Sequence, residues 1–191
     1  MKLRTICFDL DNTLVDRDAA CRHYWSLFIE RHAPAFQTDG PQRALERLLI
    51  EDCHGWTGRR EFFTWVAATY PELGQSPEQL WSDYWDELPR YITTYPGVPE
   101  LLAWLQSRFQ LTLVSNGSSA LQRSKLARCE LEGYFAECLF PAKSAWKNPT
   151  RKSSRKWHAG VAICPGKSCL WAMIPRGTLW APTRRNFAPA G

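Results

Sequence analysis

Two aspartates two residues apart, Asp9 and Asp11, directly follow a short apolar run and are the residues of this sequence best suited to chemistry. The run Ile6–Phe8 predicts the end of a buried strand, and in open α/β sheets ligands bind where parallel strands end. Asp9 can act as a nucleophile, since aspartate forms covalent aspartyl-phosphate intermediates, and it is also a hard oxygen ligand for Mg²⁺. Asp11 is close enough to protonate a leaving alkoxide and later deprotonate a water. A polar turn that caps a helix would use the same residue types.

A second polar segment follows another apolar run. Leu111–Val114 predicts a short buried strand, and Ser115–Ser118 precedes a helical pattern at about 120–129. Main-chain N–H groups at a helix start bind anions; Ser115 adds a hydroxyl and Asn116 an amide for a phosphoryl oxygen. An ordinary helix cap explains this segment when it is taken alone. Two such segments, each behind a strand, favour phosphoryl chemistry.

The two segments together resemble motifs of a known family. Asp9-x-Asp11-Asn12-Thr13-Leu14 and Val114-Ser115-Asn116-Gly117 are similar to the first and second motifs of the haloacid dehalogenase superfamily of hydrolases, mostly magnesium-dependent phosphatases. The resemblance covers roughly residues 2–140. It implies an α/β fold with a Rossmann-like parallel sheet core and an inserted α-helical cap domain.

The resemblance also implies roles for individual residues. Asp9 would be the nucleophile and a magnesium ligand, and Asp11 the acid/base, with its main-chain carbonyl on the metal. Ser115, Thr13 and Asn116 would bind the phosphate. The second aspartate favours phosphatases over true dehalogenases, which need no leaving-group acid there, so the expected substrate is a small phosphorylated metabolite.

The apolar spacing between the two motifs is helical and punctuated by proline and glycine. It predicts about four helices, and we expect a helical cap at 17–91 inserted between core segments 1–16 and 92–140. In the family resembled, such an insertion closes over the active site and selects the substrate. An ordinary helical subdomain with an aromatic core fits the same pattern. Arg17, His23 and Arg59 could face a cleft, although lone residues of these types more often lie on a solvated face.

The last segment, 141–191, has a different composition. It holds ten basic residues, no acidic one, six prolines and four tryptophans, so it carries +10 while the first 140 residues carry −5. Nothing in it resembles a strand or an amphipathic helix. We therefore expect an incomplete core and a C-terminal segment that is disordered or non-native.

Two explanations of this basic segment stay open. It could bind nucleic acid, since Lys and Arg neutralise phosphates and Trp stacks on bases. We favour a slip of the reading frame between about Leu139 and Ala142. With free choice of codons, a neighbouring frame can encode Val-Glu-Lys-Pro-Asp-Pro from 141–154 and Val-Gly-Asp-Asp-Pro from 170–181, which resemble the family's third and fourth motifs.

The frame slip has consequences for activity. The printed chain lacks the acidic metal ligands of the fourth motif, and Lys147 stands only near the place of the third-motif lysine, in Trp-Lys-Asn-Pro rather than Lys-Pro-Asp. Lys147 is thus a doubtful phosphate-binding residue, and we expect the chain to be inactive or severely impaired. We also expect the strand before Asp9 to be poorly covered on one flank.

The remaining composition narrows location and partners. Seven cysteines without a C-x-x-C pair favour free thiols in a reducing cytoplasm, and no apolar run approaches the length of a membrane span. We expect a cytoplasmic protein with no membrane partner. We do not expect a nucleic-acid partner, because the basic charge comes from 141–191 alone. The oligomeric state and the particular phosphate ester are not determined by these residues.

Overall fold

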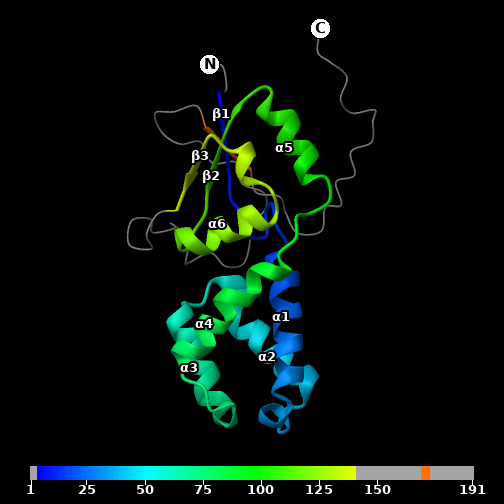
Figure 1. Ribbon diagram of the computed structural model, residues 1–191, viewed down its shortest axis with the longest axis vertical. Helices are drawn as coiled ribbons and strands as arrows, with labels where there is room; N and C mark the ends of the chain where they lie inside the picture. Colours follow the sequence, from blue (N-terminus) through cyan, green and yellow to red (C-terminus); the bar gives the residue numbers. More distant parts are fainter. Residues whose placement is uncertain (1–3, 141–168, 173–191) are drawn as a thin grey trace. The chain divides into compact units, whose positions relative to one another are not determined.

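The computed structural model describes residues 4–140 and 169–172. The chain divides into two compact units: Met1–Val15 with Thr94–Gly191, and Asp16–Thr93 (Figure 1). The second unit extends slightly beyond the expected insertion 17–91 at both ends. No helix in the described ranges is long and apolar enough to cross a membrane.

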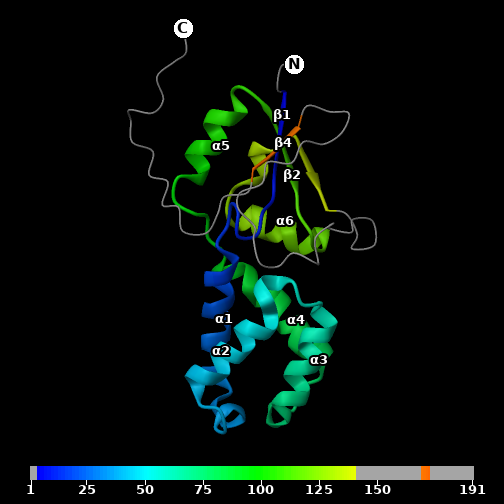
Figure 2. The ribbon, with the colours of Figure 1, turned by 180° about the vertical axis from the view of Figure 1, so that it is seen from behind.

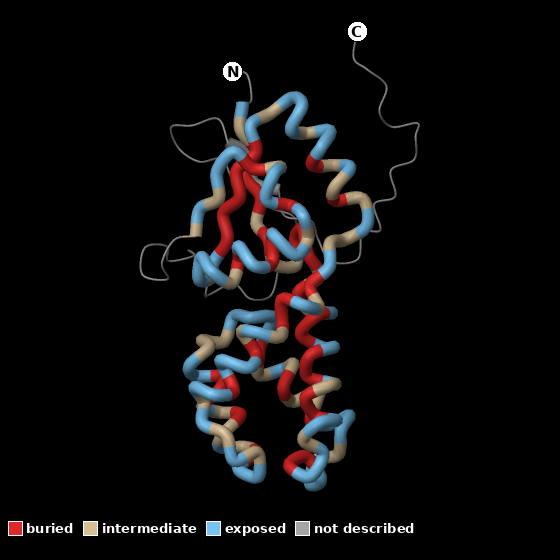
Figure 3. Tube along the Cα trace, viewed as in Figure 1, coloured by how far each residue is buried: buried red, intermediate tan, exposed pale blue. Residues whose placement is uncertain are grey.

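The first unit contains a parallel sheet. Its four strands are β1 (Thr5–Phe8), β2 (Gln110–Val114), β3 (Glu137–Leu139) and β4 (Cys169–Ala172). They are arranged in the order β3-β2-β1-β4, and every pairing is parallel (Figures 1 and 2). Most of β1 and β2 is buried, as expected of parallel strands covered on both faces (Figure 3). The α/β class predicted from the sequence is confirmed.

The strand β4 corrects one expectation. We expect no strand after Pro141 from the sequence, yet the backbone of Cys169–Ala172 pairs in parallel with β1, Thr5 opposite Cys169 and Phe8 opposite Ala172. The strand β1 therefore has a partner on both sides, β2 and β4, and the predicted uncovered flank is wrong. All four residues of β4, Cys-Leu-Trp-Ala, are apolar, and a short continuous apolar run is consistent with a strand of a parallel sheet.

Helices connect the strands of this unit. α5 (Val98–Gln106) follows the helical insertion and precedes β2, while α6 (Ser119–Arg128) and the short 3₁₀ helix η5 (Glu132–Tyr134) lie between β2 and β3. Gly97, the N-cap residue of α5, has φ 82°, a left-handed conformation that glycine adopts without strain. Ser118 begins α6, because its side chain accepts a hydrogen bond from the main-chain N–H of Leu121.

The second unit is helical throughout its regular structure. Its elements are α1 (Arg17–Arg31), η1 (Ala33–Phe36), α2 (Pro41–Asp52), η2 (Cys53–Gly55), α3 (Arg59–Thr69), η3 (Pro71–Leu73), α4 (Pro77–Glu87) and η4 (Leu88–Tyr91). The start of α4 shows how the sequence sets a boundary. Ser76 and Gln79 form a reciprocal capping box, and Pro77 occupies the first turn, where its missing N–H costs nothing.

Aromatic side chains fill the interior of the helical unit. Trp25 is fully buried and its ring centroid lies 4.9 Å from that of Tyr24 and 5.7 Å from that of Phe62. Tyr24 in turn packs edge-on against Tyr84 at 5.1 Å. Such pairs contribute about 0.5–1.5 kcal/mol beyond their buried area. The aromatic core that the helical pattern allowed is therefore present in this unit.

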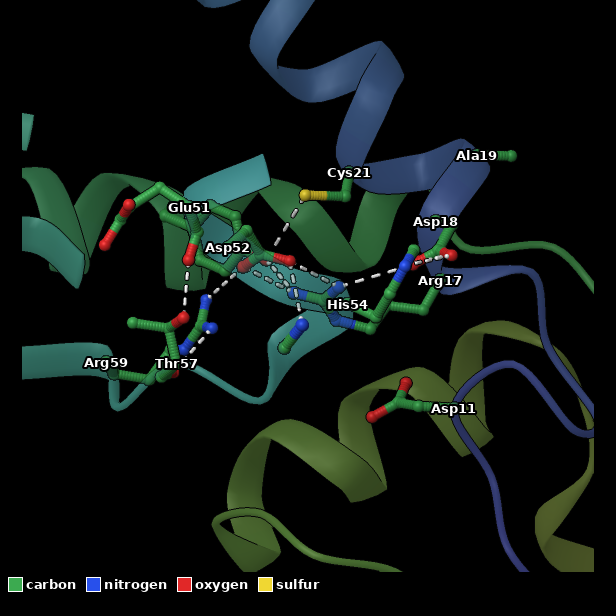
Figure 4. A network of polar contacts seen from close by, with 12 residues as sticks. Asp11, Arg17, Asp18, Ala19, Cys21, Glu51, Asp52, His54, Thr57 and Arg59 are labelled. Atoms are coloured by element: carbon green, nitrogen blue, oxygen red, sulfur yellow. Dashed lines mark hydrogen bonds and ion pairs between the residues drawn. The ribbon is translucent and has the colours of Figure 1, made fainter. Parts of the chain in front are cut away.

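A buried ion-pair network joins three helices of the same unit (Figure 4). Asp52, at the end of α2, receives two hydrogen bonds from Arg17, at 2.8 and 2.9 Å, and one from Arg59 at 2.7 Å. Arg17 also donates to the hydroxyl of Tyr84 at 3.0 Å. Arg17 and Arg59 are thus held inside the helical unit rather than on a solvated face. His23 is exposed, with its ring against that of Tyr91.

Candidate active site

The loop after β1 is held by its own apolar residues. Leu10, Leu14 and Val15 are completely buried, and the carbonyl oxygen of Leu10 accepts hydrogen bonds from the main-chain N–H groups of Leu14 at 3.0 Å and Val15 at 3.2 Å. Asn12 adopts φ 59°, a left-handed conformation that asparagine tolerates better than most residues. The alternation of buried Leu10 with Asp9 and Asp11 leaves both carboxylates on the open side of the loop.

Four of the predicted site residues come together at the ends of β1 and β2. Thr13 is buried, and its hydroxyl lies 3.5 Å from a carboxylate oxygen of Asp9. Ser115, which follows β2 and is 2% exposed, hydrogen-bonds to Asp9. Asp11 joins the same group through hydrogen bonds from residues of α6. Two carboxylates, Asp9 and Asp11, and the hydroxyl of Ser115 are therefore adjacent. Their roles as nucleophile, acid/base and phosphate ligand stay a prediction.

Two residues that sequence reasoning missed complete this group. Gln122 donates through Nε2 to Oδ2 of Asp11 at 3.0 Å and to Oγ of Ser115 at 2.6 Å. Lys125 Nζ lies 2.7 and 2.8 Å from the two carboxylate oxygens of Asp11. Both residues are buried, at 1% and 2% exposure. Their spacing of three places them on one face of α6, and that spacing behind a Ser-Asn-Gly-Ser segment was the available signal.

Gly117 leaves room for Gln122. A Cβ atom at Gly117 would lie 3.1 Å from two side-chain carbons of Gln122, closer than nearly all real contacts of this kind. A larger residue would therefore push the amide away from Asp11 and Ser115. The glycine of the second motif has a packing reason in this chain, independent of any contact with a phosphate.

The surroundings of Asp9 disfavour the ionised form of its carboxylate. Burial raises the pKa of Asp9 to about 6, and repulsion from Asp11 adds to the rise, while hydrogen bonds from Leu10 and Ser115 and the charge of Lys125 lower it only partly. A carboxylate with its pKa raised in this way is stabilised by any added cation. The site thus favours either a proton or a metal at Asp9.

This charge predicts a stability change in Asp9→Asn. The folded state holds the Asp9 proton more tightly than the unfolded chain, because the pKa rises from 3.8 to about 6. The stability that this proton contributes is complete below pH 3.8 and is lost as the pH rises through about 6. Asp9→Asn should therefore be more stable than the parent by about 1–3 kcal/mol at neutral pH and nearly equal to it at acidic pH.

Urea unfolding of both proteins across that pH range measures the difference. Asp86→Asn, which removes an exposed carboxylate from α4, is the control and should show a small difference from the parent at every pH. A difference between Asp9→Asn and the parent that does not grow with pH would contradict the charge assigned to Asp9.

The site offers few protein ligands for a metal, and Mg²⁺ is the ion that such a site suits. Within residues 4–140 and 169–172, no three His, Cys, Asp or Glu side chains are grouped to hold a metal. Mg²⁺ is commonly bound by one or two carboxylates with waters and substrate phosphate completing its shell. The raised pKa of Asp9 fits such a cation. The family resemblance implies the main-chain oxygen of Asp11 as a second ligand.

Two predicted site residues are not part of this buried group. The side chain of Asn116 is exposed, and only its main-chain oxygen approaches the group, 3.5 Å from Nε2 of Gln122. Lys147 lies outside the described residues. Lys125 is the only lysine within residues 4–140 and 169–172, and it contacts the carboxylate of Asp11.

The parallel sheet, the helical insertion after its first strand, and paired aspartates at that strand's end define a class of α/β hydrolases. The chain belongs to the haloacid dehalogenase-like hydrolases, whose family model matches residues 3–146. The resemblance noted from the two motifs is thereby confirmed. No curated protein matches the chain significantly.

Solved structures share the fold. The HAD-type hydrolase YfnB of Bacillus subtilis, solved with magnesium bound, is 24% identical with a TM-score of 0.50, covering 72% of this chain and 65% of its own. A Thermotoga maritima protein described as a β-phosphoglucomutase is 21% identical with a TM-score of 0.53, covering 72% and 61%. A Clostridium difficile protein described as a phosphatase is 15% identical with a TM-score of 0.53, covering 75% and 63%. This chain thus spans less than two thirds of the length of each.

Proposed function

We propose that this chain derives from a magnesium-dependent phosphomonoester hydrolase that acts through an aspartyl-phosphate at Asp9. The observation that carries the proposal is the partly buried Asp9 carboxylate, with a pKa raised to about 6, next to Asp11 and Ser115 at the ends of β1 and β2. An ionised carboxylate with a raised pKa is stabilised when a cation binds beside it, so Asp9 suits a site that binds a cation and a phosphoryl group. One fold neighbour is described as a phosphatase and another as a β-phosphoglucomutase, and both descriptions name phosphoryl chemistry.

The reaction follows from the placement of these groups. A carboxylate oxygen of Asp9 attacks phosphorus, the bond from phosphorus to the ester oxygen breaks, and the departing alkoxide takes a proton from Asp11. Asp11 then removes a proton from a water that attacks the same phosphorus. That attack releases inorganic phosphate and restores the Asp9 carboxylate. Ser115 would donate its hydroxyl hydrogen bond to a phosphoryl oxygen throughout.

Magnesium would be held by the Asp9 carboxylate and the main-chain oxygen of Asp11. When bound, it would neutralise phosphoryl charge beside the attacking carboxylate. The substrate would be a small phosphorylated metabolite. The helical unit, Asp16–Thr93, would act as the cap that selects it.

We further propose that the printed chain is impaired. Its last 51 residues contain no acidic side chain. They therefore cannot supply the acidic metal ligands that the family's fourth motif provides. The sequence of β4, Cys-Leu-Trp-Ala, pairs beside β1 and likewise offers no carboxylate there. A frame slip after Phe140 would account for this composition.

Covalent labelling tests the Asp9 assignment in the protein as it exists. The full chain, incubated with acetyl phosphate and Mg²⁺ and then reduced with borohydride, should contain homoserine at position 9, because borohydride reduces the acyl phosphate. Asp9→Asn should give no such product. Asp11→Asn should still be labelled, since the acetate leaving group needs no acid. Equal labelling of Asp9→Asn, or labelling only at another residue, would contradict the proposal.

A further inference from the structure

Lys125 is a buried cation that belongs to neither motif. Its side chain is 3% exposed, and its Nζ contacts both carboxylate oxygens of Asp11, at 2.7 and 2.8 Å. Lysine is almost never fully buried without a charged partner, because the desolvated ammonium must be compensated. α6 therefore brings a positive charge to the site from the helix that follows the second motif.

The charges of the site show what this cation does. Asp9 and Asp11 together carry two negative charges when ionised, and Lys125 balances one of them. Without it, two uncompensated carboxylates would repel the oxygens of a phosphoryl group and attract additional metal ions. With it, the pair carries the charge of a single carboxylate.

The contacts of Asp11 in this structure are those of an ionised carboxylate, so the acid role requires that one oxygen first leave Lys125 and take up a proton. Both side-chain oxygens of Asp11 are in contact with Lys125, and one of them also accepts the 3.0 Å hydrogen bond from Gln122. Gln122 reaches Ser115 with the same nitrogen at 2.6 Å. The Asp11 carboxylate is therefore directed toward α6, and its position is tied to that of Ser115.

We propose that Lys125 is the built-in counter-ion of this carboxylate pair, which keeps the Asp11 side chain on α6 and away from the metal and so favours binding of a phosphoryl group. This inference rests on the proposed function and adds a residue to it. Lys125 is a positioning and charge-balancing residue: it acts through Asp11. Gln122 supports it by joining Asp11 to the phosphoryl-binding hydroxyl.

Binding of a cation and an anion to the full chain tests the role without any turnover. Lys125→Met should bind Mg²⁺ about 5- to 10-fold more tightly and tungstate, a tetrahedral oxyanion, about 10-fold more weakly, as expected for loss of one nearby charge. Lys125→Arg should retain both affinities within about 3-fold because the charge remains. Calorimetry measures each affinity. A loss of structure would weaken both ligands, so opposite signs identify charge balancing.

Arg123→Met is the matched control. It removes an equal charge from the exposed face of α6, where Arg123 pairs with Glu132 at 2.9 Å and 52% exposure. Both affinities should stay within about 2-fold of the parent, because exposed pairs are screened by solvent. If Lys125→Met shifts both affinities in the same direction, or shifts neither while the parent binds both ligands, the proposal is wrong and the hydrolase assignment stands.

A double-mutant cycle separates failure of this inference from failure of the proposed function. Asp11→Asn and Lys125→Met should be coupled by at least about 10-fold in the unfolding equilibrium, because each single variant leaves a buried partner unpaired. Absence of coupling overturns the proposal whatever the chain binds. A parent chain that binds neither Mg²⁺ nor tungstate overturns the proposed function and the role of Lys125 with it, even where coupling shows the ion pair to exist.

Discussion

Restoring the neighbouring frame after Phe140 should raise turnover of a generic aryl phosphate by at least about 10³-fold over the printed chain. Removal of a single preorganised charge-stabilising group typically costs 10²–10³-fold in rate, and the printed chain lacks both the third-motif lysine and the acidic residues of the fourth motif. Lys125 already balances Asp11, so it does not replace a lysine at the phosphoryl group itself. The effects of two such losses should combine.

The measurement compares the two purified proteins with p-nitrophenyl phosphate and Mg²⁺. The frame-restored chain carrying Asp9→Asn is the control, and it should lose the gained activity entirely. Removal of Mg²⁺ with a chelator should do the same, and added Mg²⁺ should restore it. These controls exclude a contaminating phosphatase as the source of the gain.

Two results would contradict the frame slip. One is turnover at an ordinary rate by the printed chain. The other is a coding sequence that continues without the hidden Lys-Pro-Asp and Gly-Asp-Asp segments. The basic segment would then be native, and retention on heparin that falls with salt and vanishes on cutting after Phe140 would favour nucleic-acid binding.

Asp52→Ala should destabilise the helical unit by about 3–5 kcal/mol, since it leaves two guanidinium groups without their shared partner. Asp52 is 1% exposed and Arg17 is 5% exposed, so water cannot replace the lost carboxylate at Arg17. Burial would raise the pKa of Asp52, yet Arg17 and Arg59 hold it below its ordinary value. The carboxylate is therefore ionised and bound at neutral pH, and removing it breaks the contact between α1, α2 and α3.

Urea unfolding followed by tryptophan fluorescence measures this loss, because Trp25 lies in the core of the same unit. Arg31→Ala is the control within the unit. Arg31 bonds Glu87 at 2.8 Å but is 50% exposed, and such pairs contribute at most about 1 kcal/mol. Equal losses in Asp52→Ala and Arg31→Ala would show that the buried network contributes no more than a surface pair.

Much of the fold could be predicted because short local patterns specify it. The apolar runs before Asp9 and before Ser115 correspond to β1 and β2, and the helical spacing between them corresponds to α1–α4. Strand β4 could not be predicted in this way. Its four apolar residues fit a strand or a buried helix segment equally well, and the edge of β1 with which they pair is a property of the assembled sheet.

The candidate site, too, was determined partly by the sequence and partly by the tertiary structure. The sequence alone determined which polar residues stand at the strand ends, Asp9, Asp11 and Ser115, because each follows closely on an apolar run that forms a strand. Only the tertiary structure decided which cation reaches Asp11. Lys125 is far from Asp11 in the sequence, and a lysine on a helix gives no sign of its partner until folding buries it against a carboxylate. Likewise, Arg17, Arg59 and Asp52 are ordinary charged residues in the sequence, and the packing of three helices makes them one buried network.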